Sequence, residues 1–147
     1  MTTLWGSLES GILINIGVLA GYDKLLDSRI LILLAQANFQ QKINILSSLC
    51  ELLAPEYPNL KSYHETIKLI ESAQKARNKF AHNSIHFNEE TTKMNLSTYS
   101  SRGKLKLNVE VVELSDVQEV SAKIHEALCS LHLLITQKEI KPVWDRN

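Results

Sequence analysis

Residues 60–82 read LKSYHETIKLIESAQKARNKFAH and predict one long helix. At about 100° per residue, one face of this helix would carry Tyr63, Ile67, Ile70, Gln74, Arg77 and Ala81. A neighbouring polar stripe would carry His64, Glu71, Lys75, Asn78 and His82. Asparagine tolerates the left-handed conformation that often ends a helix. Asn83 is therefore expected to stop this helix and to leave His82 in its last turn.

The chain before this helix also has helical periodicity. A first helix with one buried face is predicted by apolar residues at spacings of three and four: Trp5, Leu8, Ile12, Ile16 and Leu19. Asn15 lies among them and is interpreted as a hydrogen-bonded core amide, because buried polar groups need partners. A second helical region is expected from Leu25 to Leu53, with a break near Asn38. The prolines that follow end that region.

After residue 82 the period of the sequence changes to two. Residues 93–99 and 104–111 alternate polar and apolar side chains. This alternation predicts a β-hairpin inserted at about residues 85–113. Ser115 is followed three residues later by Gln118, the spacing of a capping box. A final amphipathic helix is expected from there to about residue 137.

The composition predicts one globular domain spanning residues 1–147, mainly α. Sixteen basic and sixteen acidic residues balance, so nucleic-acid binding would need a local patch. The apolar run 11–21 is shorter than the roughly 20 residues that span a bilayer, so no membrane association is expected. Cys50 and Cys129 lie on apolar faces and predict reduced thiols in a cytoplasmic protein.

Arg77, Asn78 and His82 form the pattern Arg, polar residue, three variable residues, His, late in the predicted helix. This pattern resembles the signature of the HEPN superfamily, the higher eukaryotes and prokaryotes nucleotide-binding domains. The resemblance implies a HEPN-like four-helix bundle, here with the β-hairpin inserted before the last helix. Many members of the superfamily are metal-independent ribonucleases. The resemblance therefore implies an endoribonuclease of the toxin, defence or RNA-processing type, with no cofactor and no metal.

These residue types suit RNA cleavage through the attack of the 2′-hydroxyl on the adjacent phosphorus. Histidine can carry protons because its ordinary pKa is about 6.5. Arginine stays charged and holds phosphate oxygens with a planar fork. We therefore expect Arg77 to stabilise phosphoryl charge, His82 to transfer protons and Asn78 to orient the imidazole. In the alternative interpretation Arg77 lays its stem over apolar residues and His82 bonds the last helix carbonyls.

Basic residues on the helix and the hairpin are candidates for holding the RNA backbone: Lys75, Lys79, Arg102, Lys104 and Lys106. Solvated surface charges are the alternative interpretation of the same residues. No cluster of Cys, His or carboxylates has the spacing of a metal site. Some HEPN toxins carry a Tyr two residues after the His, where a partner enzyme modifies it. This chain has Ser84 there, which puts that mode of regulation in doubt.

The expected partners are RNA, a second copy of the chain, and an antitoxin or other partner protein. Five residues turn a helix by about 500°, which would point Arg77 and His82 roughly 140° apart. A homodimer that shares one site between two protomers would overcome this separation, and HEPN-like ribonucleases are similar in this respect. Two alternatives stay open. One is a catalytically silent module of the same fold that binds a nucleotide, RNA or protein, and the other is an unrelated helical interaction protein.

Overall fold

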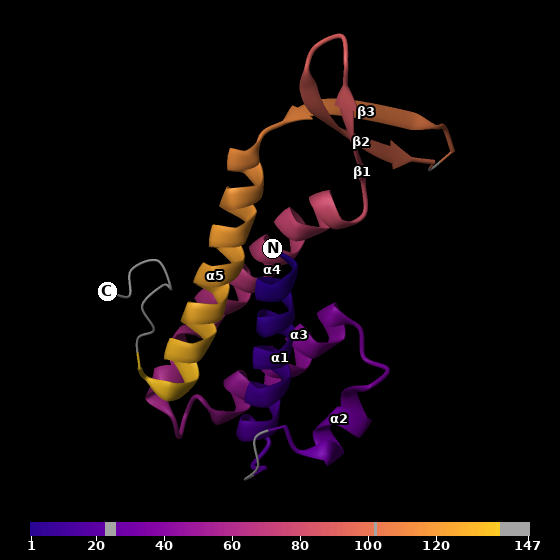
Figure 1. Ribbon diagram of the computed structural model, residues 1–147. Coiled ribbons are helices and arrows are strands. Elements are labelled where there is room, and N and C mark those ends of the chain that lie inside the picture. Colours follow the sequence, from indigo (N-terminus) through magenta and orange to yellow (C-terminus); the bar gives the residue numbers. More distant parts are fainter. Residues whose placement is uncertain (23–25, 102, 139–147) are drawn as a thin grey trace.

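A computed structural model describes residues 1–22, 26–101 and 103–138 as helices with one small antiparallel sheet (Figure 1). In chain order the elements are α1 (Thr2–Leu19), α2 (Ser28–Leu34), α3 (Phe39–Leu53), the 3₁₀ helix η1 (Pro58–Ser62), α4 (Tyr63–Ala81), β1 (Ser84–Asn88), β2 (Lys93–Ser100), β3 (Lys106–Val112) and α5 (Leu114–Thr136). The prediction of a mainly α fold is confirmed.

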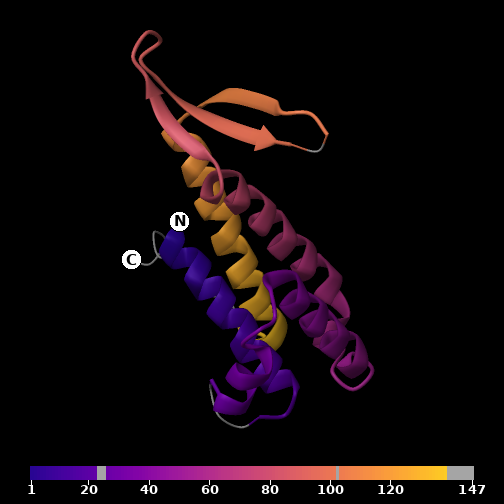
Figure 2. The same cartoon turned by 90° about the vertical axis from the view of Figure 1, so that its right-hand side faces the viewer.

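The long helices pack in a closed ring around one core. α1 lies between α3 and α5, and α4 contacts both α3 and α5 (Figures 1 and 2). The centre is filled by side chains that are at most 1% exposed: Leu8, Ile12, Ile43, Leu46, Ile70, Ile124 and Leu131. Burying each of these side chains contributes about 1.5–3 kcal/mol. Packing of this kind stabilises α1 although its glycines lower its helix propensity.

α1 comes close to α5 at Gly11. A Cβ atom on Gly11 would lie 3.3 Å from Cδ1 of Leu128, so the glycine leaves room for that side chain. One turn later, the Asn15 side-chain amide donates to the Gly11 carbonyl at 2.8 Å. The hydrogen bond expected for Asn15 is therefore confirmed, but its side chain is only half-buried, so the expected core position is wrong.

The expected break in the second helical region is confirmed at Asn38, which caps α3. Asn38 Oδ1 accepts from the Gln41 backbone N–H at 2.9 Å, and Gln41 Oε1 accepts from the Asn38 N–H at 2.8 Å. This capping box satisfies backbone donors that the first turn of a helix leaves unpaired. It therefore fixes where α3 begins and where Phe39, its first residue, is placed. Leu25, where the region was expected to begin, lies outside the described residues.

α4 is shorter at both ends than the predicted helix of residues 60–82, because it begins at Tyr63, after η1, and ends at Ala81. His82 follows as the cap residue, with φ −115° and ψ 5°. The expected left-handed conformation of Asn83 is wrong, because Asn83 is not among the residues with positive φ. Its side-chain amide caps the helix instead and donates to the Lys79 carbonyl at 2.7 Å. This hydrogen bond satisfies a carbonyl of the last turn without the left-handed backbone.

The predicted hairpin is wrong in its number of strands, because a third strand, β1, precedes it. The sheet has the order β1-β2-β3 with antiparallel neighbours. Residues 84–88 pair with residues 93–97, and residues 94–100 pair with residues 106–112. The sheet projects beyond the end of the helices where α4 ends and α5 begins (Figure 1). The five residues of β1 alternate polar and apolar side chains as regularly as a strand requires, so this strand was predictable from the sequence and was overlooked beside the two longer alternating segments.

The final helix has a different cap from the predicted one. Glu113, and not Ser115, is the cap residue of α5, and Asp116 completes the capping box in place of Gln118. Asp116 Oδ2 accepts from the Glu113 N–H at 2.7 Å. α5 then ends at Thr136, close to the predicted residue 137. Among the described residues, none of the helices has the length and apolar content to cross a membrane.

Candidate functional site

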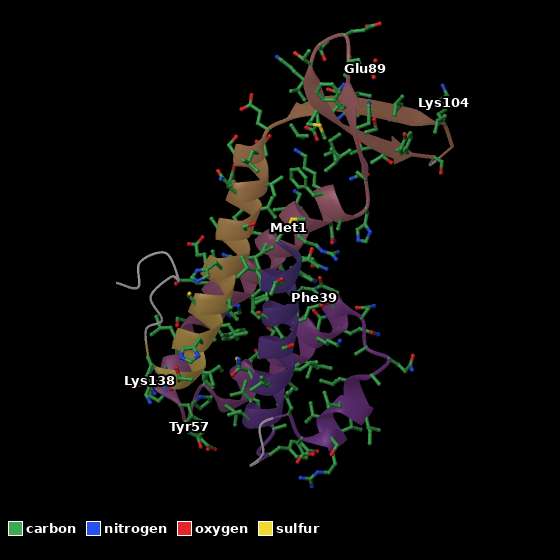
Figure 3. All side chains as sticks on the ribbon, viewed as in Figure 1. Met1, Phe39, Tyr57, Glu89, Lys104 and Lys138 are labelled. Carbon is green, nitrogen blue, oxygen red and sulfur yellow. The ribbon has the colours of Figure 1, made fainter. Side chains whose placement is uncertain are left out.

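The predicted motif lies beside a pocket of about 410 Å³ between α4, α1 and the start of α3. α4 and the residue after it contribute Gln74, Arg77, Asn78 and His82. α1 contributes Trp5 and Glu9, and the beginning of α3 contributes Asn38, Phe39 and Gln40. Figure 3 labels Phe39, which lies beside the N-terminal half of α1. The pocket is therefore built from three elements that are distant in the sequence.

Arg77 brings the three motif residues together within one chain. Its Nη1 donates to Asn78 Oδ1 at 3.2 Å and lies 3.4 Å from Nε2 of His82. The expected separation of Arg77 and His82 is therefore wrong. The estimate of 140° assumed that both residues are helical, whereas His82 has left the helix. In addition, the long arginine side chain extends towards the C-terminal end of α4, where His82 lies.

The guanidinium of Arg77 also lies over an aromatic ring. Its Cζ is 5.2 Å from the centroid of the Trp5 ring, within the range of a cation–π interaction. Trp5 is buried and packs against Phe39, with 4.7 Å between ring centroids. Because the α3 capping box fixes Phe39 and the core holds Trp5, the Arg77 fork is held on a rigid support. Preorganised charge of this kind stabilises developing negative charge better than a mobile side chain.

The contact between Arg77 and His82 has a consequence for the imidazole. An arginine can only donate hydrogen bonds, so Nε2 of His82 must accept if this contact is a hydrogen bond. In that arrangement Nδ1 is the ring nitrogen that is left to donate a hydrogen bond. His82 is exposed, so an incoming group can reach it. A phosphate that bound the Arg77 guanidinium would draw it away from His82. Nε2 of His82 would then be free to accept a proton.

Three features of this site escaped the sequence analysis. The aromatic support of Trp5 and Phe39, the half-buried carboxylate of Glu9, and the amides of Asn38 and Gln40 were not predicted to lie here, whereas Gln74 was expected on the same helix face as Arg77. Trp5 was placed correctly on a buried face. Nothing in the local pattern of α1 or α3 indicates that these residues meet the end of α4.

No protein-family model, no curated protein and no solved structure matches this chain. The resemblance to the HEPN superfamily therefore rests on the motif residues, and any function must be argued from the site itself.

The structure does not bring the predicted RNA-binding lysines to the motif. Lys75 and Lys79 line a different groove, between α4 and α5, together with Asp116, Glu119 and Lys123. Lys79 forms an ion pair with Glu110 of β3 at 3.0 Å, which neutralises part of its charge. The structure thus separates these lysines from the pocket of Arg77 and His82. Whether they bind RNA remains a prediction.

The remaining predicted basic residues belong to the sheet. Lys106 begins β3, and Lys104 lies in the connection before it, far from the helices in Figure 3. Arg102 lies outside the described residues. In the described part of the chain, no group of three His, Cys, Asp or Glu side chains is placed to hold a metal ion. Cys50 is a buried thiol, and burial raises its pKa to about 11.

Proposed function

We propose that this chain is an endoribonuclease with a HEPN-like helical fold that cleaves RNA through its own 2′-hydroxyl. The proposal rests on one observation above all. A positioned arginine and a histidine from the predicted motif lie 3.4 Å apart beside an open pocket. The supported arginine fork can hold the phosphate, and the histidine can exchange protons next to it. A toxin, a defence protein or an RNA-processing enzyme would each fit this activity.

The proposed reaction needs two proton transfers. The 2′-oxygen forms a bond to phosphorus, and its proton passes to a base. The bond from phosphorus to the 5′-oxygen breaks, and that oxygen takes a proton from an acid. His82 supplies one of these two groups, and Glu9 in the same pocket is the other candidate. Arg77 stabilises the phosphoryl oxygens during the step, while Asn78 helps to hold the arginine through its Oδ1.

The pocket also offers groups that suit a nucleotide. Side-chain amides can bond the edges of bases, and a partly exposed aromatic ring can stack on a base. Gln40, Gln74 and Phe39 provide these two kinds of group next to the phosphate-binding arginine. An antitoxin or other partner protein could control such a site by covering it. A homodimer remains part of the proposal, although the geometry of Arg77 and His82 no longer requires a site shared between protomers.

The test is cleavage of total RNA by purified protein in excess chelator. We expect products that end in a 2′,3′-cyclic phosphate or a 3′-phosphate. His82→Ala should lower the rate by about a hundredfold or more, the usual scale for losing a positioned acid or base. Since His82 is exposed and outside the helix, its loss should cost no more than about 1 kcal/mol of stability. His86→Ala is the matched control, because His86 is an exposed histidine on β1.

Three outcomes would contradict the proposal. Cleavage that requires magnesium and leaves a 3′-hydroxyl would exclude attack by the 2′-hydroxyl. Equal cleavage by the wild type and by a folded Arg77→Ala, His82→Ala double variant would point to a contaminating nuclease. RNA or nucleotide binding without cleavage would favour the catalytically silent binding module.

A further inference from the structure

The outer edge of β3 has no partner strand among the described residues. β3 pairs with β2 on one side, from Lys106 to Val112, and is the last strand in the order β1-β2-β3. Figure 2 shows this edge on the side of the sheet away from the helices. The strand is seven residues long and contains no proline. Exposed edges usually carry prolines, bulges or charged side chains that prevent pairing with another chain, and of these features β3 has charges, at Lys106 and Glu110.

The two faces of β3 differ in character. Lys106, Asn108 and Glu110 alternate on one face, where Glu110 forms its ion pair with Lys79 of α4. Leu107, Val109 and Val111 lie on the opposite face and are 59%, 49% and 51% exposed. Tyr99 of β2 lies opposite Leu107 in the sheet register and is also exposed. An apolar row therefore runs along an open strand edge.

The sequence of β3 is complementary to itself when two copies run antiparallel. With a two-fold axis at Asn108, Lys106 lies opposite the partner's Glu110, and Glu110 lies opposite the partner's Lys106. On the other face, Leu107 lies opposite the partner's Val109. From Lys106 to Glu110 each position thus meets a residue of matching character, whereas Val112 falls opposite the partner's Lys104; the matched cross-strand pairs stabilise a sheet. Moving the axis to Val109 would place Lys106 opposite the partner's Val112 and would remove both charge pairs.

We propose that β3 pairs with β3 of a second copy of this chain, so that two three-stranded sheets become one continuous antiparallel sheet. A second copy of the chain is the partner because the charges of β3 are complementary to those of an antiparallel copy of β3. The open backbone groups become hydrogen-bonded, and the apolar rows of both strands join into one larger face. Two-fold pairing of identical surfaces is the commonest form of assembly. This dimer does not depend on whether the chain cleaves RNA.

β1 is the other edge strand and fits itself less well. It has only five residues, Ser84–Asn88, and carries neither lysine nor carboxylate. Pairing about His86 would place Ile85 opposite the partner's Phe87 and would form no charge pair. The dissociation of a β1 dimer would thus be insensitive to the charges of β3, and this difference separates the two surfaces in an experiment.

The experiment uses two charge reversals in the full chain, Lys106→Glu and Glu110→Lys. In either variant alone, like charges would face each other at both symmetric positions. In a mixture of the two variants, every charge would again face its opposite. Lys93→Glu is the matched control, because Lys93 lies in the same sheet but pairs only with Asn88 of β1. Light scattering gives the mass against the 16.6 kDa of one chain, and isotope labelling of one variant identifies heterodimers by mass spectrometry.

We expect the wild type and Lys93→Glu to be dimers at micromolar concentration. Each single β3 reversal should raise the dissociation constant at least tenfold, and the mixture should form heterodimers with close to wild-type affinity. High salt should weaken the wild-type dimer, because its charge pairs are exposed to screening. The Lys106→Glu variant keeps the pair between Lys79 and Glu110, so its effect cannot come from losing that contact.

Circular dichroism confirms that each variant is folded. If Glu110→Lys does not fold, Val109→Lys serves as the second variant, since Val109 is exposed and would face the partner's Leu107. A monomeric wild type would overturn the proposal. A Lys106→Glu dimer as strong as the wild type, or a mixture of reversals that stays monomeric, would overturn it equally.

Discussion

Replacing Trp5 tests whether the buried indole holds Arg77 in place. Trp5→Leu removes the ring under the guanidinium, whose Cζ lies 5.2 Å from the ring centroid, and also the ring pair with Phe39 at 4.7 Å. The cation–π contact contributes about 0.5–2 kcal/mol and the aromatic pair about 0.5–1.5 kcal/mol. With the smaller volume of leucine in a buried position, we expect a total loss of about 2–4 kcal/mol.

A double-mutant cycle isolates the contact between the two side chains. Arg77→Met keeps an apolar stem and removes the charge, and Trp5→Leu, Arg77→Met combines both changes. Both proteins that carry Trp5→Leu lose the ring pair with Phe39, so its contribution cancels in the cycle. What remains is the coupling of indole and guanidinium, which should be about 1 kcal/mol in favour of the pair. Trp5→Phe is the control, because it keeps an aromatic face under Arg77.

Urea unfolding of the four proteins at neutral pH gives the four free energies. A coupling energy within about 0.3 kcal/mol of zero is the scatter expected of independent sites. That result would refute the argument that Trp5 supports the guanidinium. If the chain cleaves RNA as proposed, Trp5→Leu should also lower the rate at a temperature where it is fully folded. A coupled pair with unchanged cleavage would show that the support is structural only.

Two further predictions concern the end of α4 and the core. Asn83→Ala should destabilise the chain by about 0.5–1.5 kcal/mol, because the Lys79 carbonyl loses its 2.7 Å hydrogen bond, and unchanged urea unfolding would contradict this. Cys50 has a pKa raised from 9.0 to about 11 by burial, so the unfolded chain ionises its thiol first as the pH rises. The contribution of the neutral Cys50 thiol to the free energy of unfolding is therefore fully present below pH 9. It is lost as the pH rises towards about 11, which lowers the free energy of unfolding by at most about 3 kcal/mol. Cys50→Val should lack this part of the pH dependence, and parallel stability curves for the two proteins would exclude it.

Local patterns in the sequence were sufficient to locate most helices. The apolar spacing in α1 and α5 reflects a buried stripe, which any helix at the edge of a core must have. The break at Asn38 was also predictable, because a capping box with Gln41 is a local interaction between close neighbours. The motif was predictable for the same reason, because Arg77, Asn78 and His82 are close neighbours at the end of one helix.

Other local predictions were wrong where two different residues or conformations could cap the same helix end. Asn83 can end a helix through a left-handed backbone or through its side chain, and the structure uses the side chain. Ser115 and Glu113 can both cap α5, and Glu113 does so with Asp116. In each case the sequence offers more than one cap, and the helix end concerned adjoins a strand, β1 after α4 and β3 before α5.

The sequence by itself determined the helical elements and the arginine and histidine at the end of α4, because these depend on neighbours along the chain. Only the tertiary structure decided that Trp5 and Glu9 of α1 and Phe39 of α3 meet Arg77 in one pocket. It also decided that Lys75 and Lys79 lie in another groove and that none of the described strands pairs with the outer edge of β3. These outcomes depend on how the helices pack around the core, and packing joins residues whose separation along the chain leaves no periodic signal.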